Sequence, residues 1–255
     1  MRHPFMNISI VMTTYNGGRY VIDQLSSIYP YLEKGDEIII SDDGSKDNTL
    51  QLIYSYISNK PNVKVISGPQ QGVVKNFEYA LSFACKDIIM FADQDDIWLP
   101  SKISTIREKF NSNEDVELVM HDMFLATNEE INHDNYCQRS FCIRKRRHGV
   151  LYNLFYNGYY GCCMCFTQNF KKVILPFSKY TNMYDEWIGL VAEHRRKVLF
   201  YDEALIVHRV HNNNMGQNLT VFQKIKSRFT LLKSYLDYLY NKKINSFDNF
   251  ICVER

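Results

Sequence analysis

Apolar residues follow two different periods along the first hundred residues of this chain. Short, mostly apolar runs of strand length occupy residues 8–14, 37–41, 63–67 and 88–92. Between these runs, apolar residues recur every three or four positions, as they do along the buried face of a helix. The alternation predicts a β-α-β-α-β-α-β unit with a mainly parallel sheet and right-handed crossovers.

The same periods continue beyond residue 98 and end in a long amphipathic segment. Further helices are predicted at 100–110, 169–175 and from residue 183, and further strands at 116–125, 159–167, 198–201 and 205–210. From Gln217 onward, apolar residues at helical spacing stand opposite lysines. We expect an α/β fold with one Rossmann-like sheet flanked by helices over residues 1–216, followed by a helical tail over 217–255.

Composition narrows the class of protein. With 255 residues and 45% of them hydrophobic, the chain can form one large core. A formal charge of +2 is too small to indicate a nucleic-acid partner. No apolar run has the length of a membrane span, and seven irregularly spaced cysteines suit a reducing compartment. We expect a cytoplasmic protein in which Cys162 and Cys165 are buried as small hydrophobic residues.

An acidic stretch, Asp93-Gln94-Asp95-Asp96, follows the fourth predicted strand. Open α/β sheets bind their ligands at the carboxyl ends of their strands. Three carboxylates within four residues repel one another, so a divalent cation is a natural counter-charge. The alternative is a solvated acidic loop that caps the next helix.

Two common nucleotide-binding motifs are missing. The loop after the first strand holds only Gly17-Gly18 where a dinucleotide fingerprint needs three glycines. The sequence also lacks the G-x-x-x-x-G-K-[ST] pattern. These observations argue against a Rossmann dehydrogenase and exclude a P-loop enzyme.

Three loop motifs carry a resemblance to a known family. They are Thr13-Thr14-Tyr15-Asn16, Ser41-Asp42-Asp43-Gly44-Ser45-Lys46-Asp47 and the stretch Phe91–Trp98. In this order and spacing they resemble the family 2 glycosyltransferases of the GT-A fold. The resemblance covers residues 8–110 well and the rest more loosely. The wording Asp-Gln-Asp-Asp-Ile-Trp is similar to that of bacterial rhamnosyltransferases of surface-polysaccharide synthesis.

The resemblance implies a nucleotide site built by residues 7–98. Tyr15 would lie against the base, the Thr13 backbone would meet the edge of the base, and Asp42 would accept its imide N–H. Asn76 would reach the nucleotide from the third helix. The alternatives are that Tyr15 covers core, that Asp42 forms a turn, and that Asn76 is an exposed polar group on its helix.

The resemblance also implies a metal, Mn²⁺ or Mg²⁺, that neutralises the departing nucleoside diphosphate. Asp95 is the first choice as its ligand. Asp93 would either bind the metal or contact the ribose, and His211 would be a third ligand. Arg209 would supply fixed positive charge near the diphosphate, although a polar loop after a strand explains Arg209 and His211 equally well.

A carboxylate at the start of a later helix is the implied catalytic base. Asp185 is the first choice and Glu186 the second, in an acceptor-binding half over residues 99–216. Both acids also suit the first turn of a helix for structural reasons. Similar enzymes carry histidine before this aspartate, and this chain has Tyr184.

We therefore expect an inverting glycosyltransferase that uses a dTDP-, UDP- or GDP-sugar. The acceptor would be a saccharide or a polyprenyl-diphosphate-linked saccharide. The alternatives are a sugar-phosphate nucleotidyltransferase, which needs a glycine-rich basic loop after the first strand, and a non-catalytic nucleotide-sugar-binding protein.

Two basic segments leave the location of the protein open. Arg144-Lys145-Arg146-Arg147 is either a solvated loop or a site for pyrophosphate or anionic lipid. The tail would either pack on its own domain or on a second copy in a homodimer, or lie on the inner face of the plasma membrane.

Overall fold

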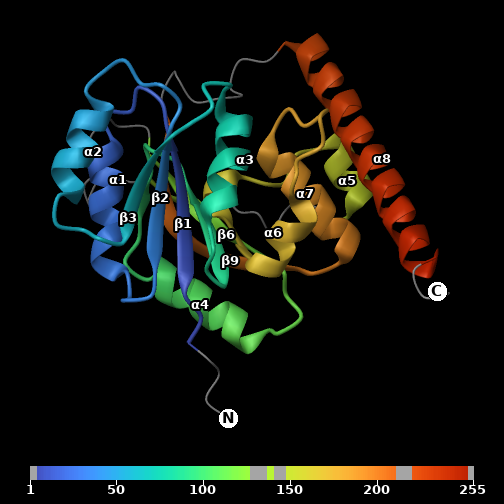
Figure 1. The fold of residues 1–255 in the computed structure, drawn as a ribbon, viewed down its shortest axis with the longest axis horizontal. Coiled ribbons are helices and arrows are strands. Elements are labelled where there is room, and N and C mark those ends of the chain that lie inside the picture. Colours follow the sequence, from blue (N-terminus) through green and yellow to red (C-terminus); the bar gives the residue numbers. More distant parts are fainter. Residues whose placement is uncertain (1–4, 127–136, 141–147, 211–219, 252–255) are drawn as a thin grey trace.

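The computed structural model describes residues 5–126, 137–140, 148–210 and 220–251. Its first half is a parallel unit of four strands in the order β3-β2-β1-β4 (Figure 1). These strands are β1 (Ile8–Thr14), β2 (Glu37–Asp42), β3 (Val63–Ser67) and β4 (Ile88–Ala92). They are joined through α1 (Val21–Ile28), α2 (Thr49–Ile57) and α3 (Val73–Phe83). The predicted β-α-β-α-β-α-β unit is confirmed.

The second half continues the same sheet with mixed strand directions. β4 pairs antiparallel with β8 (Met164–Thr167), which pairs antiparallel with β6 (Leu118–Ala126). β6 runs parallel to β9 (Val198–Arg209), and β9 runs antiparallel to β5 (Ile97–Trp98). β7 (Cys137–Ser140) also pairs antiparallel with β6, in addition to the pairings of β6 with β8 and β9. The parallel order predicted for the sheet therefore holds for its first four strands, and the nine-stranded sheet as a whole is mixed.

Three predicted strands have different limits in the structure. The strands expected at 198–201 and 205–210 form one strand, β9, because the exposed Asp202 and Glu203 interrupt the apolar run without ending the strand. The strand expected at 159–167 begins with a 3-10 turn, η3 (Gly161–Cys163), and becomes β8 only at Met164.

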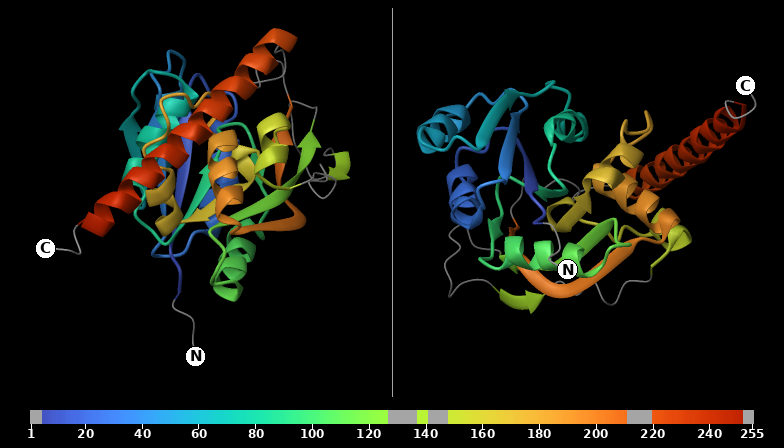
Figure 2. Two further views of the ribbon diagram at one scale, coloured as in Figure 1. Left: turned by 90° about the vertical axis from the view of Figure 1, so that its right-hand side faces the viewer. Right: turned by 60° about the horizontal axis from the view of Figure 1, so that its bottom comes forward.

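Helices cover both faces of the curled sheet (Figure 2). The second half supplies α4 (Lys102–Ser112), α5 (Val150–Phe155), α6 (Gln168–Ile174), α7 (Tyr184–Arg195) and α8 (Val221–Ile251). A 3-10 turn, η1 (Tyr29–Tyr31), follows α1. The predicted α/β class and C-terminal helix are confirmed. Among the described helices, none has both the length and the apolarity needed to span a bilayer.

The core follows from this layering. Every residue of β1 and β4 is buried, because both strands lie inside the sheet and helices cover them on either side. Cys162 and Cys165 are buried, and neither is in a disulfide. Cys165 lies on β8 as predicted for a small buried residue, whereas Cys162 lies in the turn η3 with its thiol near Asp96 and His208.

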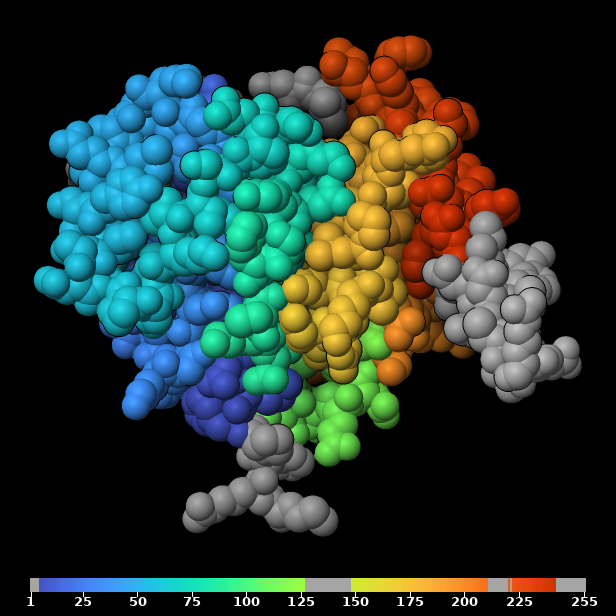
Figure 3. Space-filling view, viewed as in Figure 1, coloured from blue at the N-terminus to red at the C-terminus, as the bar shows by residue number. Residues whose placement is uncertain are grey.

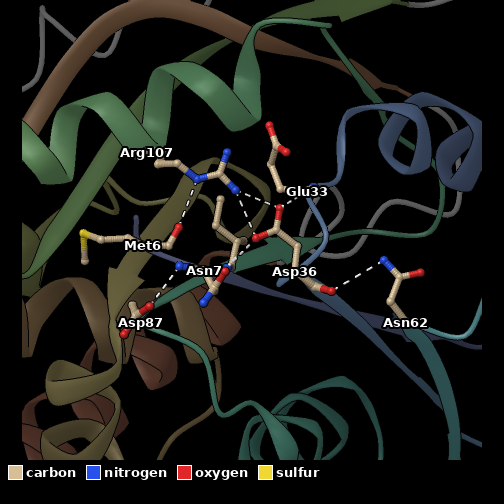
Figure 4. A network of polar contacts seen from close by, with 8 residues as sticks. Met6, Asn7, Glu33, Asp36, Asn62, Asp87 and Arg107 are labelled. Atoms are coloured by element: carbon tan, nitrogen blue, oxygen red, sulfur yellow. Dashed lines mark hydrogen bonds and ion pairs between the residues drawn. The ribbon is translucent and has the colours of Figure 1, made fainter. Parts of the chain in front are cut away.

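A polar network fixes the amino ends of the strands, away from the edge that carries the acidic stretch (Figure 4). Arg107 on α4 donates from Nη2 to both carboxylate oxygens of Asp36, at 3.0 and 2.8 Å, and from Nε to the Met6 carbonyl at 3.0 Å. Asp36 also accepts the backbone N–H groups of Ile8 and Glu33, each at 2.8 Å. One buried carboxylate thus joins β1, the start of β2 and α4.

We expect Arg107→Lys to lower the free energy of unfolding by about 1.5–3 kcal/mol, the usual range for a hydrogen bond to a charged group. Lysine keeps the positive charge but cannot form the two-pronged contact with Asp36 or reach Met6 at the same time. Urea unfolding at neutral pH measures the change. An unchanged midpoint would show that the geometry of the guanidinium group contributes nothing to stability.

Candidate active site

The carboxyl ends of β1, β2 and β4 meet at one edge of the sheet, because these strands are parallel neighbours. Three polar loops follow them: residues 15–20 after β1, 43–48 after β2 and 93–96 after β4. Hydrogen bonds join the loops. The Asn16 N–H donates to Ser45 Oγ at 2.8 Å, and Asn16 Oδ1 accepts the Lys46 N–H at 2.8 Å. The edge predicted to bind ligand is therefore one connected surface.

The Asp42 carboxylate lies at the centre of the second loop. Its Oδ1 accepts the N–H groups of Gly44 and Ser45 at 3.1 and 2.9 Å. Its Oδ2 accepts the hydroxyls of Thr14 and Ser45 at 2.9 and 2.5 Å. This is the turn-forming role that the sequence left open. A nucleobase imide would have to share or replace one of these four donors, so base recognition by Asp42 stays a prediction.

Asn76 is buried on α3, whereas one interpretation of the sequence made it an exposed helix residue. Its Oδ1 accepts the Ser41 hydroxyl at 2.5 Å, and its Nδ2 donates to the Ser41 carbonyl at 2.9 Å. Both ends of the amide are used to hold the end of β2, so that interpretation was wrong. Contact between Asn76 and the nucleotide stays a prediction.

Gln94, which the sequence reasoning passed over, ties the first loop to the acidic loop. Its Oε1 accepts the Tyr15 N–H at 3.0 Å, and its Nε2 donates to the Tyr15 carbonyl at 3.2 Å. Gly17 allows this approach, since a Cβ there would lie 2.1 Å from Gln94 Oε1. The only signal in the sequence was the place of Gln94 between two aspartates.

We expect Gln94→Ala to raise the KM for the nucleotide sugar about three- to tenfold, since each lost hydrogen bond contributes about 1 kcal/mol. The reason is that the side chain at position 94 would no longer hold the Tyr15 backbone against the acidic loop. Initial-rate kinetics check this, with Gln51→Ala on the exposed face of α2 as the matched control. Equal KM values for the two variants would contradict the role of Gln94.

Tyr15 presents an exposed aromatic side chain at this edge. Its exposed fraction is 56%, which rules out the alternative that it covers core. Thr13, the last but one residue of β1, is buried beside it. An exposed ring held by its backbone is suited to stacking on a base.

Carboxylates gather in the acidic loop. Burial and then the charges of Asp96 and Asp95 raise the pKa of Asp93 from 3.8 to about 8, and Asp185 adds to this shift although it lies 92 positions later in the chain. Asp93 and Asp95 are half-buried, and Asp96 is buried. The structure therefore brings the charges of Asp95, Asp96 and Asp185, the predicted base, to bear on Asp93.

A partly buried ion pair lies beneath this loop. His208 Nδ1 is 2.7 Å from Asp96 Oδ1. Burial alone would lower the pKa of His208, but the charge and hydrogen bond of Asp96 hold that pKa well above its ordinary value. The Cys162 thiol joins them, with the three ligand atoms within 4.8 Å of one another. A metal bound by Asp96, Cys162 and His208 would have to displace the proton shared by Asp96 and His208.

Arg209 is buried against the back of the acidic loop. Its Nε donates to the Asp95 carbonyl at 3.1 Å, and its guanidinium lies 4.4 Å from the centre of the Tyr20 ring and 3.6 Å from Asp23 Oδ2. These contacts hold the loop against α1. Contact between Arg209 and a diphosphate stays a prediction, and the predicted ligand His211 lies outside the described residues.

The first turn of α7 carries both candidate bases. Burial and then the charge of Glu186 raise the pKa of Asp185 from 3.8 to about 7. Glu186 forms an ion pair with Arg228 of α8, which occupies its carboxylate. Asp185 instead accepts the Glu186 N–H at Oδ1, at 2.8 Å. Its raised pKa suits a base that works near neutrality, and the choice of Asp185 before Glu186 stays a prediction.

Tyr184 connects this turn to β4. Its ring centre lies 5.3 Å from that of Phe91 and 4.2 Å from that of Phe77. Because Phe91 is two residues before Asp93, these contacts fix the start of α7 against the acidic loop. Gly161 leaves room for the hydroxyl, since a Cβ there would lie 2.0 Å from Tyr184 Oη.

Comparison with known proteins identifies the family. The description of the family whose sequence model matches residues 9–174 is "Glycosyl transferase family 2". The chain belongs to this glycosyltransferase family. The match contains all three loops of the candidate site.

Individual relatives of this glycosyltransferase cover only part of it. An uncharacterized glycosyltransferase of Nostoc sp. is 34% identical over 119 residues, which is 46% of this chain and 37% of the relative. The dTDP-rhamnosyl transferase RfbG of Shigella flexneri is 36% identical over 98 residues, 36% of this chain and 34% of the relative. This chain thus spans little more than a third of the length of either protein.

Solved structures share the fold of this glycosyltransferase. S. aureus TarS 1–349 in complex with UDP-GlcNAc has a TM-score of 0.66 at 17% identity, covering 84% of this chain and 62% of that one. The mannosyltransferase PcManGT of Pyrobaculum calidifontis, in complex with GDP-Man and Mn²⁺, has a TM-score of 0.58 at 15% identity. That match covers 81% of this chain and 58% of PcManGT. At these identities the likeness supports the predicted GT-A fold.

The acidic loop of this glycosyltransferase fits a divalent cation. Its donors are hard carboxylate oxygens, the type that Mg²⁺ and Mn²⁺ prefer. Burial raises the pKa of Asp93 most, and the negative charges of Asp96 and Asp95 raise it further. The charged form of Asp93 is therefore disfavoured by its neighbours. A bound cation would relieve this repulsion, so Asp93 and Asp95 suit the predicted ligand role.

Proposed function

We propose that this family 2 glycosyltransferase transfers a sugar from a nucleoside-diphosphate donor with inversion at the anomeric carbon. The observation that carries the proposal is the family match over the three loops at the carboxyl edge of the sheet. At this edge Asp185 adds to the raised pKa of Asp93, so the two carboxylates act on one another. Inversion in one displacement requires one base on the acceptor side and charge stabilisation on the leaving-group side. These two carboxylates are suited to the two roles.

In the proposed reaction, Asp185 takes the proton of an acceptor hydroxyl while the oxygen of that hydroxyl forms a bond to the anomeric carbon. The bond from this carbon to the diphosphate oxygen breaks at the same time, and the nucleoside diphosphate leaves with the electron pair. Asp185 is suited to this because burial and then Glu186 raise its pKa to about 7.

Asp95 and Asp93 are proposed to hold Mn²⁺ or Mg²⁺, with His211 as a third ligand. When bound, the cation would stabilise negative charge on the departing diphosphate. The remaining work falls to the protein: Gln94 and Tyr15 hold the two loops in register, and Arg209 supports the acidic loop through the Asp95 carbonyl. Tyr15 is proposed to stack on the base, with Thr13 and Asp42 at the edge of the base.

The donor is proposed to be a dTDP- or UDP-sugar, with a GDP-sugar as the third candidate. One relative is named as a dTDP-rhamnosyl transferase, and one structure with the same fold holds UDP-GlcNAc. The acceptor is proposed to be a saccharide or a lipid-linked saccharide of a surface polysaccharide. The nucleotidyltransferase alternative loses its support, because the chain belongs to the family 2 glycosyltransferases and the match includes all three loops of the candidate site.

Release of nucleoside diphosphate from a panel of dTDP-, UDP- and GDP-sugars, with Mn²⁺ and with a mixture of saccharide acceptors, tests this proposal. Wild type is compared with Asp185→Asn. Release by the wild type that the variant lacks supports catalysis, and NMR of the isolated product gives the anomeric configuration. Tight nucleotide-sugar binding without any turnover would instead favour the non-catalytic alternative.

A further inference from the structure

The outer face of α8 carries a long exposed apolar stripe. The α8 stripe consists of six side chains with exposed fractions between 39% at Leu232 and 77% at Phe222. The members are Phe222, Ile225, Phe229, Leu232, Leu236 and Tyr240. Because they are spaced three or four residues apart, they lie along one side of the helix. A row of exposed apolar side chains of this length indicates a binding surface.

The opposite face of α8 is already used within the domain. Leu231 and Ser234 are buried, and Asp237 accepts the Ser178 hydroxyl at 2.8 Å. Arg228 forms its ion pair with Glu186 at the start of α7. The helix crosses the outside of α7 (Figure 2) and borders the surface formed by α6 and α7 (Figure 3). Docking through this face holds the α8 stripe outward.

The neighbouring helix α5 adds to the exposed apolar surface. Leu151, Phe155 and Tyr156, in and directly after α5, are 75%, 70% and 64% exposed. α5 contacts both α7 and α8. The most exposed apolar side chains of the second half of the chain therefore lie on two helices in contact.

The charges beside the α8 stripe indicate an anionic partner. From Phe222 to Asn241 the helix has four basic residues, Lys224, Lys226, Arg228 and Lys233, and one acidic residue, Asp237. Asp237 is already bonded to Ser178. If two copies paired along their stripes as a coiled coil, Lys226 and Lys233 would flank the seam and meet basic residues of the other copy. Like charges across that seam disfavour a second copy, whereas phospholipid headgroups complement them.

We propose that the α8 stripe docks on an anionic phospholipid bilayer, with the helix lying in the plane of the headgroups. An apolar face bordered by lysines is the pattern of helices that lie at a membrane surface. Since Arg228 joins α8 to the turn that carries Asp185, docking would hold the acceptor side near the bilayer. That last consequence rests on the proposed transfer to a lipid-linked acceptor, whereas membrane binding itself does not.

Vesicle flotation with the full chain tests the proposal. We expect binding to vesicles of equal parts phosphatidylglycerol and phosphatidylcholine, and no binding to phosphatidylcholine alone. Phe222→Ser, Phe229→Ser and Leu236→Ser together should weaken binding at least about tenfold, because they remove three apolar anchors. Tyr31→Ser, Tyr54→Ser and Tyr79→Ser together form the matched control, since these exposed rings lie on η1, α2 and α3.

Charge reversal gives a second variant. Lys224→Glu, Lys226→Glu and Lys233→Glu should abolish the preference for phosphatidylglycerol, and high salt should weaken binding by the wild type. Absence of vesicle binding, or equal binding by the stripe and control variants, would overturn the proposal. So would light scattering that shows a lipid-free dimer which the stripe variant converts to a monomer. Both triple-serine variants should keep the wild-type unfolding midpoint, which separates loss of binding from misfolding. Vesicle binding is measured without any sugar transfer, so this test does not depend on the proposed enzymatic activity.

Discussion

Asp95→Asn should reduce sugar transfer about a thousandfold, which corresponds to about 4 kcal/mol in the activation free energy. Asparagine keeps the size of the side chain and removes the charge proposed to hold the cation on the diphosphate. The effect should be large because stabilisation of the leaving group counts most when the bond to it is breaking. Initial rates at saturating Mn²⁺ measure the loss.

Two further readouts separate loss of the cation from damage to the fold. Mn²⁺ with nucleoside diphosphate should raise the unfolding temperature of the wild type and not that of Asp95→Asn, because only a ligand bound to the folded state stabilises it. Without metal, the variant should be at least as stable as the wild type, since Asp95 is one of the charges that raise the pKa of Asp93. The exposed Asp115 supplies the control, Asp115→Asn, which changes the net charge equally. Rates within about threefold of wild type for Asp95→Asn would contradict the ligand role, since a positioned charge contributes more than this.

Asp185→Asn should lower kcat by about a hundred- to ten-thousandfold, the usual contribution of a positioned general base. Donor binding should change little, because the base acts on the acceptor. Glu186→Gln should lower kcat by less than about tenfold, because Arg228 already engages this carboxylate and proton transfer does not depend on it. Steady-state kinetics on the two variants decide between the two candidate bases. A larger loss for Glu186→Gln than for Asp185→Asn would reverse the assignment.

The pH dependence gives the base a signature of its own. Since the pKa of Asp185 is about 7, wild-type kcat should rise with pH up to about that value and then level off, as the carboxyl loses its proton. The residual activity of Asp185→Asn should lack this rise. A wild-type profile that is flat between pH 5 and 8 would contradict the assignment.

The same raised pKa makes a prediction about stability. Burial and then Glu186 raise the pKa of Asp185 from 3.8 to about 7, so the folded state holds a proton that the unfolded chain releases near pH 4. Stability due to this carboxyl is therefore lost as pH rises from about 4 to about 7. Asp185→Asn removes this loss, so the variant should unfold at a higher temperature than the wild type at pH 8. A variant that is inactive yet more stable would separate catalysis from folding.

Local periodicity was sufficient to predict the first half of the fold. The apolar runs that became β1, β2, β3 and β4 are separated by helical patterns, and a parallel unit follows from that order. The direction of β8 was not predictable, because the sequence marks a strand by its apolar residues and does not encode which neighbour it meets. β9 shows a second limit, since Asp202 and Glu203 interrupt the pattern while the strand continues.

Some residues of the candidate site were likewise predictable from the sequence, whereas the contacts between distant residues were not. Asp93 could be proposed because an acidic stretch follows a predicted strand, and Asp185 because the start of its helix resembles that of family 2 glycosyltransferases. The structure shows that the charge of Asp185 acts on Asp93. Contacts such as Gln94 with Tyr15 or Asn76 with Ser41 join residues 79 and 35 positions apart, so only the tertiary structure reveals them. The pairing of Glu186 with Arg228 likewise needed the position of α8.

Calorimetric titration of nucleoside diphosphates with and without Mn²⁺ tests the central claim most directly. If Asp93 and Asp95 hold a cation on the diphosphate, at least one of dTDP, UDP and GDP should bind the wild type tightly only when Mn²⁺ is present. Asp95→Asn should then bind it with the weak affinity of the metal-free wild type. Equally tight binding with and without Mn²⁺, or by wild type and Asp95→Asn in the presence of Mn²⁺, would contradict the account.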